Sequence, residues 1–143
     1  MPVVETSEGR GEVECAGVQL RELIILRVGR LMASSYEIAQ HTPLAERVGV
    51  NADQIAALAS HTDLAAGDFD PTQLRVLELV TELITTKTAA AEHIRELREL
   101  LGDEALLEAL MVIGRWSGLA LILNALDVDV DTDARFTPPN QPG

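Results

Sequence analysis

Three polar side chains at helical spacing in residues 34–48 could carry out proton transfer. In a helical segment, Ser34, Glu37 and His41 lie within about 60° of one another, on the face that carries the apolar side chains. A carboxylate and an imidazole four residues apart are one turn apart and can hydrogen-bond, which fixes the tautomer of the ring. The spacing therefore predicts that Glu37 and His41 act together as a general acid and base.

A third acidic side chain, Glu22, lies in the apolar stripe of the preceding segment. An unpaired buried carboxylate is costly, so Glu22 requires a partner. The connection between the two segments is short, and we expect Glu22 to converge with Glu37 and His41 on one site. The competing interpretation is a buried ion pair for Glu22 and a backbone carbonyl partner for the histidine. The candidate ion-pair partners are Arg27, Arg30 and Arg115.

The helices that position these residues are predicted from apolar periodicity and capping signals, and no strand alternation is present, so the fold class is all-α with about six helices. The Leu20–Ala33 helix is apolar on almost every side, which predicts a central position. Ser34 and Glu37 form a predicted capping box for the next helix, which is kinked at Pro43. The remaining expected helices are Asn51–Ala59, Asp70–Thr86, Thr88–Gly102 and Asp103–Leu126, with a loop over 61–69.

Composition excludes several classes of function. The 143 residues suit a single domain, and 11 Lys and Arg against 23 Asp and Glu give a net charge of -12, which disfavours nucleic acid and anionic membranes as partners. The single cysteine, Cys15, cannot form an intrachain disulfide, and the start of the chain lacks a secretory signal, so a cytoplasmic location is expected. The apolar segment 105–126 is interrupted by charged and polar side chains, which predicts a buried helix rather than a membrane span.

The segment Leu20–Val28, followed by Tyr36-Glu37, His41 and Pro43-Leu44-Ala45, resembles the core repeat of the carboxymuconolactone decarboxylase family. Later segments, 112–114 and 121–126, agree with the resemblance, which covers residues 18–130. The resemblance implies an AhpD-like helical bundle that self-associates as a trimer or as a hexamer made of trimers. The predicted organisation is an acidic arm over 1–17, the helical domain over 18–130 and an extended tail over 131–143.

The peroxidase branch of this family has a glutamate followed twelve residues later by C-x-x-C and then, four residues on, by histidine. The chain keeps Glu22 and His41 at that spacing but has Ser34 and Glu37 at the cysteine positions. A serine hydroxyl cannot cycle through a disulfide, so the peroxidase reaction lacks its nucleophile. The alternatives kept open are a peroxidase that uses Cys15 or an external thiol, and a non-catalytic oligomer that binds small molecules.

The decarboxylase branch, which has no cysteine pair and no cofactor, resembles the sequence better. It implies a lyase that acts by proton transfer on a small unsaturated lactone or keto acid. In this interpretation the catalytic residues are His41, Glu37 and Glu22. The expected substrate-binding residues are Tyr36, Ser34, Arg27, Arg115 and Trp116.

Two other histidines, His61 and His93, lie beside acidic residues but have no second ligand at metal spacing, and we interpret them as solvated side chains. A metal held by the glutamates and His41 is chemically possible, but the family resemblance implies none. The sequence therefore predicts no metal site.

Overall fold

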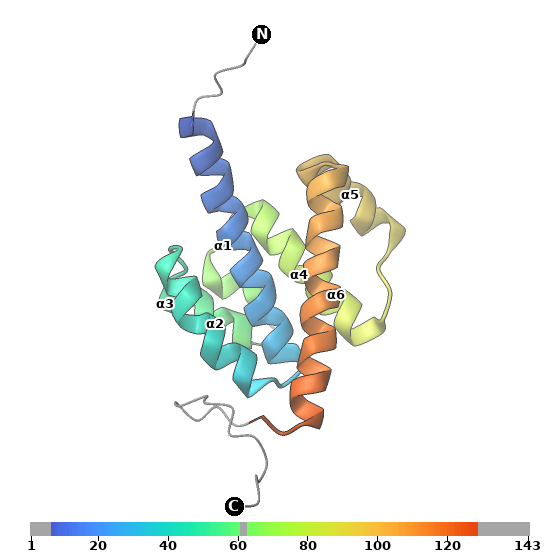
Figure 1. Ribbon diagram of the computed structural model, residues 1–143. Coiled ribbons are helices and arrows are strands. Elements are labelled where there is room, and N and C mark those ends of the chain that lie inside the picture. Colours follow the sequence, from blue (N-terminus) through green and yellow to red (C-terminus); the bar gives the residue numbers. More distant parts are fainter. Residues whose placement is uncertain (1–6, 61–62, 129–143) are drawn as a thin grey trace, which may run out of the picture.

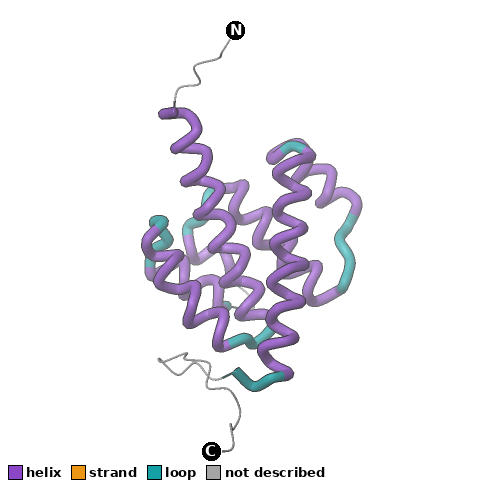
Figure 2. Tube along the Cα trace, viewed as in Figure 1, coloured by secondary structure: helices purple, strands orange, loops and turns teal. Residues whose placement is uncertain are grey.

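The chain forms a helical bundle around one central helix (Figures 1 and 2). This computed structural model describes residues 7–60 and 63–128, and their side chains from Gly17 onward. The elements are α1 (Ser7–Leu31), α2 (Ser35–Arg47), α3 (Ala52–Ala59), a 3-10 turn η1 (Leu64–Gly67), α4 (Pro71–Thr86), α5 (Ala91–Leu101) and α6 (Asp103–Ala125). The described residues contain no strand, which confirms the all-α class and is consistent with an AhpD-like bundle.

Helix α1 is central because its side chains are apolar in several directions. It packs against α2, α3, α4 and α6, and Leu23, Ile25 and Val28 have no exposed surface. Ile24 and Val28 face the core formed with α4, α5 and α6, whereas Leu23 and Leu26 face a second core formed with α2, α3 and α4. The prediction of a central helix is therefore confirmed.

The start of α1 differs from the expectation. The helix begins at Ser7, so residues 7–17 of the predicted acidic arm are helical and lengthen α1 at its start. Residues 1–6 of that arm and the predicted tail over 131–143 lie outside the described residues.

The predicted helix starts at Asn51 and Asp70 are confirmed. Asn51 accepts a hydrogen bond from the Gln54 amide at 2.9 Å, and Asp70 accepts one from the Gln73 amide at 2.7 Å; both glutamine side chains complete a capping box. The predicted cap at Thr88 is wrong, because α5 begins after Ala90, whose amide is held by the Glu82 carboxylate at 2.8 Å.

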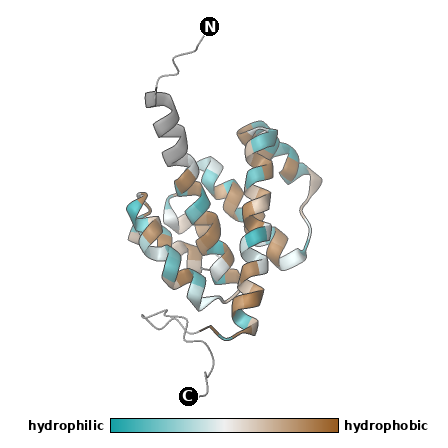
Figure 3. Cartoon of the chain, viewed as in Figure 1, coloured by the Kyte–Doolittle hydropathy of each residue, from teal (hydrophilic) through white to brown (hydrophobic). Residues whose placement is uncertain are grey.

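Helix α6 is buried on one side only, which corrects the prediction of a buried helix. Ala109, Ile113 and Ala120 are buried, whereas Leu107 and Met111 are 59% and 65% exposed. In Figure 3 brown turns recur along the visible length of α6, with white and teal turns between them. By length and composition α6 could also cross a membrane, and it is the single helix of the described chain for which that holds. One exposed face remains because a single chain offers α6 partners on one side alone.

Arg27 joins three helices from within the core. It is 1% exposed, and its guanidinium donates to the carbonyls of Leu58 at 2.7 Å and Ser60 at 2.6 Å, at the end of α3. It also donates to the Thr81 hydroxyl of α4 at 3.0 and 3.1 Å. Burial lowers the pKa of Arg27, and no carboxylate pairs with it among the described residues. Arg27 thus supplies hydrogen-bond donors to backbone carbonyls at the end of α3.

We predict that Arg27→Ala lowers the free energy of unfolding by about 3 kcal/mol, because it leaves buried carbonyls unpaired and opens a cavity. Arg30→Ala, at an exposed position near the end of the same helix, should change it by less than about 0.5 kcal/mol. Urea denaturation followed by circular dichroism measures both. Equal midpoints for Arg27→Ala and the unchanged protein would contradict the structural role of Arg27.

Candidate functional site

Glu22 and His41 form a hydrogen-bonded pair between α1 and α2. The Nδ1 atom of His41 lies 2.8 Å from Oε2 of Glu22, and the side chains are 12% and 10% exposed. A carboxylate oxygen can only accept a hydrogen bond. Nδ1 of His41 therefore carries a hydrogen and donates the hydrogen bond to Glu22. The second nitrogen, Nε2, has no hydrogen-bond partner within the described part of the chain. Nε2 is therefore the atom of His41 that is available for proton transfer.

Trp116 of α6 closes one side of this pair. The rings of His41 and Trp116 meet edge to face, with centroids 4.6 Å apart and an angle of 78° between their planes. The indole Nε1 and the hydroxyl of the neighbouring Ser117 are both buried, and neither has a hydrogen-bond partner among the described residues. Polar groups of this kind are rare in a protein interior, which indicates a site where a ligand or water supplies the missing partners.

Glu37 is the most unusual side chain of the site. It is 1% exposed, and neither carboxylate oxygen has a hydrogen-bond partner in the described structure. The predicted capping box is only half formed: Ser34 Oγ accepts from the Glu37 amide at 3.4 Å, but the Ser34 amide donates to the Gly29 carbonyl at 2.9 Å. Because Gly29 satisfies that amide, the Glu37 side chain does not cap the helix and lies in the interior instead.

Gly29 lets α2 approach α1 closely at this point. A Cβ atom at position 29 would lie 3.2 Å from the Ile38 side chain, 3.5 Å from Glu37 Cβ and 3.7 Å from Glu37 Oε2. The Glu37 side chain therefore packs directly over the bare backbone of α1. The contact explains why Glu37 is excluded from water.

The two carboxyl groups of the site, Glu37 and Glu22, have different surroundings. Burial raises the pKa of Glu37 to about 7, and the positive charge of His41 opposes this rise. Glu22, by contrast, has the hydrogen bond from His41. The predicted hydrogen bond between Glu37 and His41 is absent, since Nδ1 of His41 bonds Glu22 and neither oxygen of Glu37 has a partner in the described structure. Near neutral pH the Glu37 carboxyl group is thus close to half protonation, whereas Glu22 is the hydrogen-bond partner of His41.

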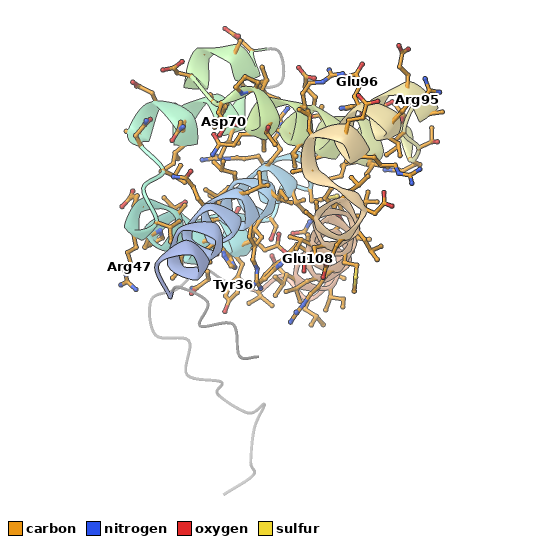
Figure 4. The ribbon with its side chains drawn as sticks, turned by 90° about the horizontal axis from the view of Figure 1, so that it is seen from above. Tyr36, Arg47, Asp70, Arg95, Glu96 and Glu108 are labelled. Carbon is orange, nitrogen blue, oxygen red and sulfur yellow. The ribbon has the colours of Figure 1, made fainter. Side chains whose placement is uncertain are left out.

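An apolar groove of about 600 Å³ lies between α1 and α6, next to this site. Its walls include Leu20, Ile24 and Val112, with Arg21, Glu108 and Arg115 as the charged residues, and Trp116 lines it as well as contacting His41. Trp116 therefore stands between the groove and the histidine. Figure 4 shows Glu108 on one side of the molecule and Arg95 and Glu96 of α5 on another.

The predicted substrate-binding residues do not all lie at one site. Arg115 lies at the groove, with its guanidinium 6.0 Å from the centre of the Trp116 ring. Arg27 and Ser34 are buried, make hydrogen bonds within the protein and do not line the groove, so their contact with substrate stays a prediction. Tyr36 lines a separate small pocket near the end of α6, away from the groove.

Sequence reasoning missed the contact between His41 and Trp116 and the buried hydroxyl of Ser117. These residues are far from His41 in the sequence, so no local periodicity could indicate the contact. The interpretation of His93 as a solvated side chain is wrong. This side chain is 11% exposed, and its Nδ1 lies 2.8 Å from Glu82 Oε2, a contact that joins α5 to α4. His61 lies outside the described residues.

Comparison with known proteins agrees with this part of the structure. Residues 16–82 match the model of the carboxymuconolactone decarboxylase family. This segment, just under half of the 143 residues, is similar to that family. It contains Glu22, Glu37 and His41, whereas Trp116 and the two later segments of the predicted resemblance lie beyond it. No curated protein and no solved structure matched the chain. Among the described residues no three His, Cys, Asp or Glu side chains are grouped to hold a metal ion.

We predict that Glu37→Gln removes a specific pH dependence of stability. With its pKa raised to about 7, Glu37 holds its proton in the folded state after the unfolded chain has lost it, so stability falls as the pH rises from about 4.5 to about 7. The loss is on the order of 3 kcal/mol. Glutamine is neutral throughout, so the variant should lack this slope in urea denaturation at pH 5 and pH 8.

The matched control is Glu46→Gln, at an exposed position of the same helix, which should keep the slope. An unchanged slope in Glu37→Gln would show that the buried carboxyl group does not titrate as described.

Proposed function

We propose that the chain is a lyase of the carboxymuconolactone decarboxylase type, which works without a cofactor by general acid and base catalysis on a small unsaturated lactone or keto acid. The supporting observation is the buried Glu37 carboxyl group, unpaired at both oxygens and placed beside the Glu22–His41 pair. A carboxyl group with a pKa near 7 can hold a proton at neutral pH and release it to a substrate.

The reaction has a simple balance of atoms and electrons. The bond between the substrate's carboxylate carbon and the adjoining carbon breaks, and CO2 leaves. The electron pair of that bond moves into the conjugated carbonyl system. One proton from Glu37 or from His41 Nε2 is then added to carbon, and water restores the proton to the enzyme.

Each residue has a separate part in this proposal. Glu37 and His41 are the catalytic residues that exchange protons with the substrate. Glu22 is a positioning residue, because its hydrogen bond to Nδ1 fixes the ring and leaves Nε2 free. Arg115 at the groove could attract the substrate carboxylate, and Trp116 would cover the reacting atoms.

We predict that His41→Gln lowers kcat for CO2 release from a panel of unsaturated lactones and keto acids by at least a hundredfold, with the fold retained. Glu22→Gln should lower kcat less and shift the pH profile, because the ring loses its orienting charge. Isotope-labelled CO2 release measures turnover, and circular dichroism checks the fold.

The chain offers a matched control in His93→Gln. His93 of α5 has the same 2.8 Å contact with a glutamate, Glu82 of α4, but this pair is not part of the candidate site. Turnover should therefore not change. Turnover that survives His41→Gln would contradict the proposal. Absence of turnover on the whole panel, with binding measured by calorimetry, would favour the non-catalytic alternative, and peroxide consumption that Cys15→Ser abolishes would favour the peroxidase alternative.

A further inference from the structure

Six positions of α6 form a straight uncharged seam on its outward side. They are Leu107, Met111, Gly114, Gly118, Leu121 and Ala125. Their spacing alternates between four and three residues, which keeps them on one narrow face of a helix, as in helices that pack on other helices. All six are exposed, and Leu107, Met111 and Leu121 are 59%, 65% and 60% exposed. The face is therefore unpartnered in the single chain.

The two glycines of the seam are not explained by packing within the chain. A Cβ atom at Gly114 or at Gly118 would meet nothing within 4 Å. Glycine inside a helix is less favourable than alanine by about 1 kcal/mol. Glycines four residues apart allow the backbone of a second helix to approach closely, so their place on an exposed apolar face indicates a helix from outside this chain.

The seam is symmetric about position 116. Reversing the helix exchanges Leu107 with Ala125, Met111 with Leu121, and Gly114 with Gly118. Two antiparallel copies of α6 would therefore place Met111 against Leu121, the two glycines at the crossing point, and Leu107 against the small Ala125. An interface between identical copies related by a two-fold axis requires this kind of self-complementarity.

We propose that α6 pairs with α6 of a second copy of this chain, antiparallel, with the axes crossing at Gly114 and Gly118. The proposal rests on these contacts alone and does not depend on the proposed function.

The seam is long enough for a specific interface. The 23 residues of α6 extend over about 34 Å. A stable dimer buries about 800 Å² on each partner, from roughly 20 residues. Ile122 and Leu126 extend the exposed apolar surface beside the seam, and the adjoining groove continues it toward α1. In the antiparallel arrangement Ile122 of the second copy comes to lie beside Glu108, over the groove that leads to Trp116.

Charge favours a second copy over a lipid bilayer as the occupant of this face. The seam itself is uncharged, but Glu108 and Arg115 lie on its flank, and a bilayer core would have to take in both. The chain carries a net charge of -12, which opposes approach to anionic lipid. The inner side of α6 is also already packed on α1, α4 and α5.

We predict that Met111→Cys and Leu121→Cys proteins, both with Cys15→Ser, cross-link to each other when mixed and oxidised. Neither should cross-link efficiently alone, because each position lies about 15 Å along the helix from its own copy in an antiparallel pair. Denaturing electrophoresis of proteins with different mass tags measures this. Efficient cross-linking of Met111→Cys to itself, or no cross-linking of the mixture, would overturn the proposal.

Gly118→Leu gives a second test, because a bulky side chain at the crossing separates the two helices. Analytical ultracentrifugation should show the dissociation constant raised at least tenfold, with helicity unchanged. Ala56→Leu, at an exposed position of α3, should leave association unchanged. A dimer, or a hexamer with two-fold axes, supports the proposal. A monomer, a closed trimer without two-fold axes, or association only with neutral lipid vesicles overturns it.

Discussion

Exclusion of the Glu37 carboxyl group from water is the constraint on which the candidate site depends. No group of the described chain hydrogen-bonds its oxygens, so the folded protein favours the neutral form up to about pH 7. Glu22, only one helix away, has a hydrogen-bonding partner in His41. Two carboxylates in different surroundings are the usual basis for assigning an acid and a base within one site.

The close approach of α1 and α2 creates this difference. Gly29 removes the side chain that would separate the helices, and its carbonyl accepts the amide of Ser34. The glutamate that would cap α2 is thereby left without that role. The start of α2 therefore has a weaker cap, and the glutamate that would complete it is buried instead. Such exceptions to the usual capping pattern are common at functional sites.

Much of the fold could be predicted because its signals are local. Asn51 and Asp70 with their glutamines specify helix starts within four residues, and the apolar character of α1 indicates its central position. The convergence of Glu22 and His41 was also predicted, since it follows from the spacing on two consecutive helices. The hydrogen bonds within the site could not be predicted, because the spacing allows either Glu22 or Glu37 to bond His41.

Contacts between distant parts of the chain account for the remaining differences. Trp116 reaches His41 from the last helix, and Arg27 reaches carbonyls at the end of α3 and a hydroxyl of α4. Neither partner is visible in the periodicity of a single segment. An arginine among aliphatic residues is compatible with substrate binding or with structural bonding, and only the position of α3 and α4 decides between them.

The hydrogen bonds of Arg27 also make the two sides of the site, α1 and Trp116, differ in how firmly they are held. Glu22 and Gly29 lie on the same helix as Arg27, which fastens that helix to α3 and α4 through buried hydrogen bonds. Displacing α1 would break all of these bonds at once, whereas turning the Trp116 ring breaks none, since its indole nitrogen is unbonded. The α1 side of the Glu22–His41 pair is therefore fixed by buried hydrogen bonds, whereas the Trp116 side is held by ring packing without a hydrogen bond of its indole nitrogen.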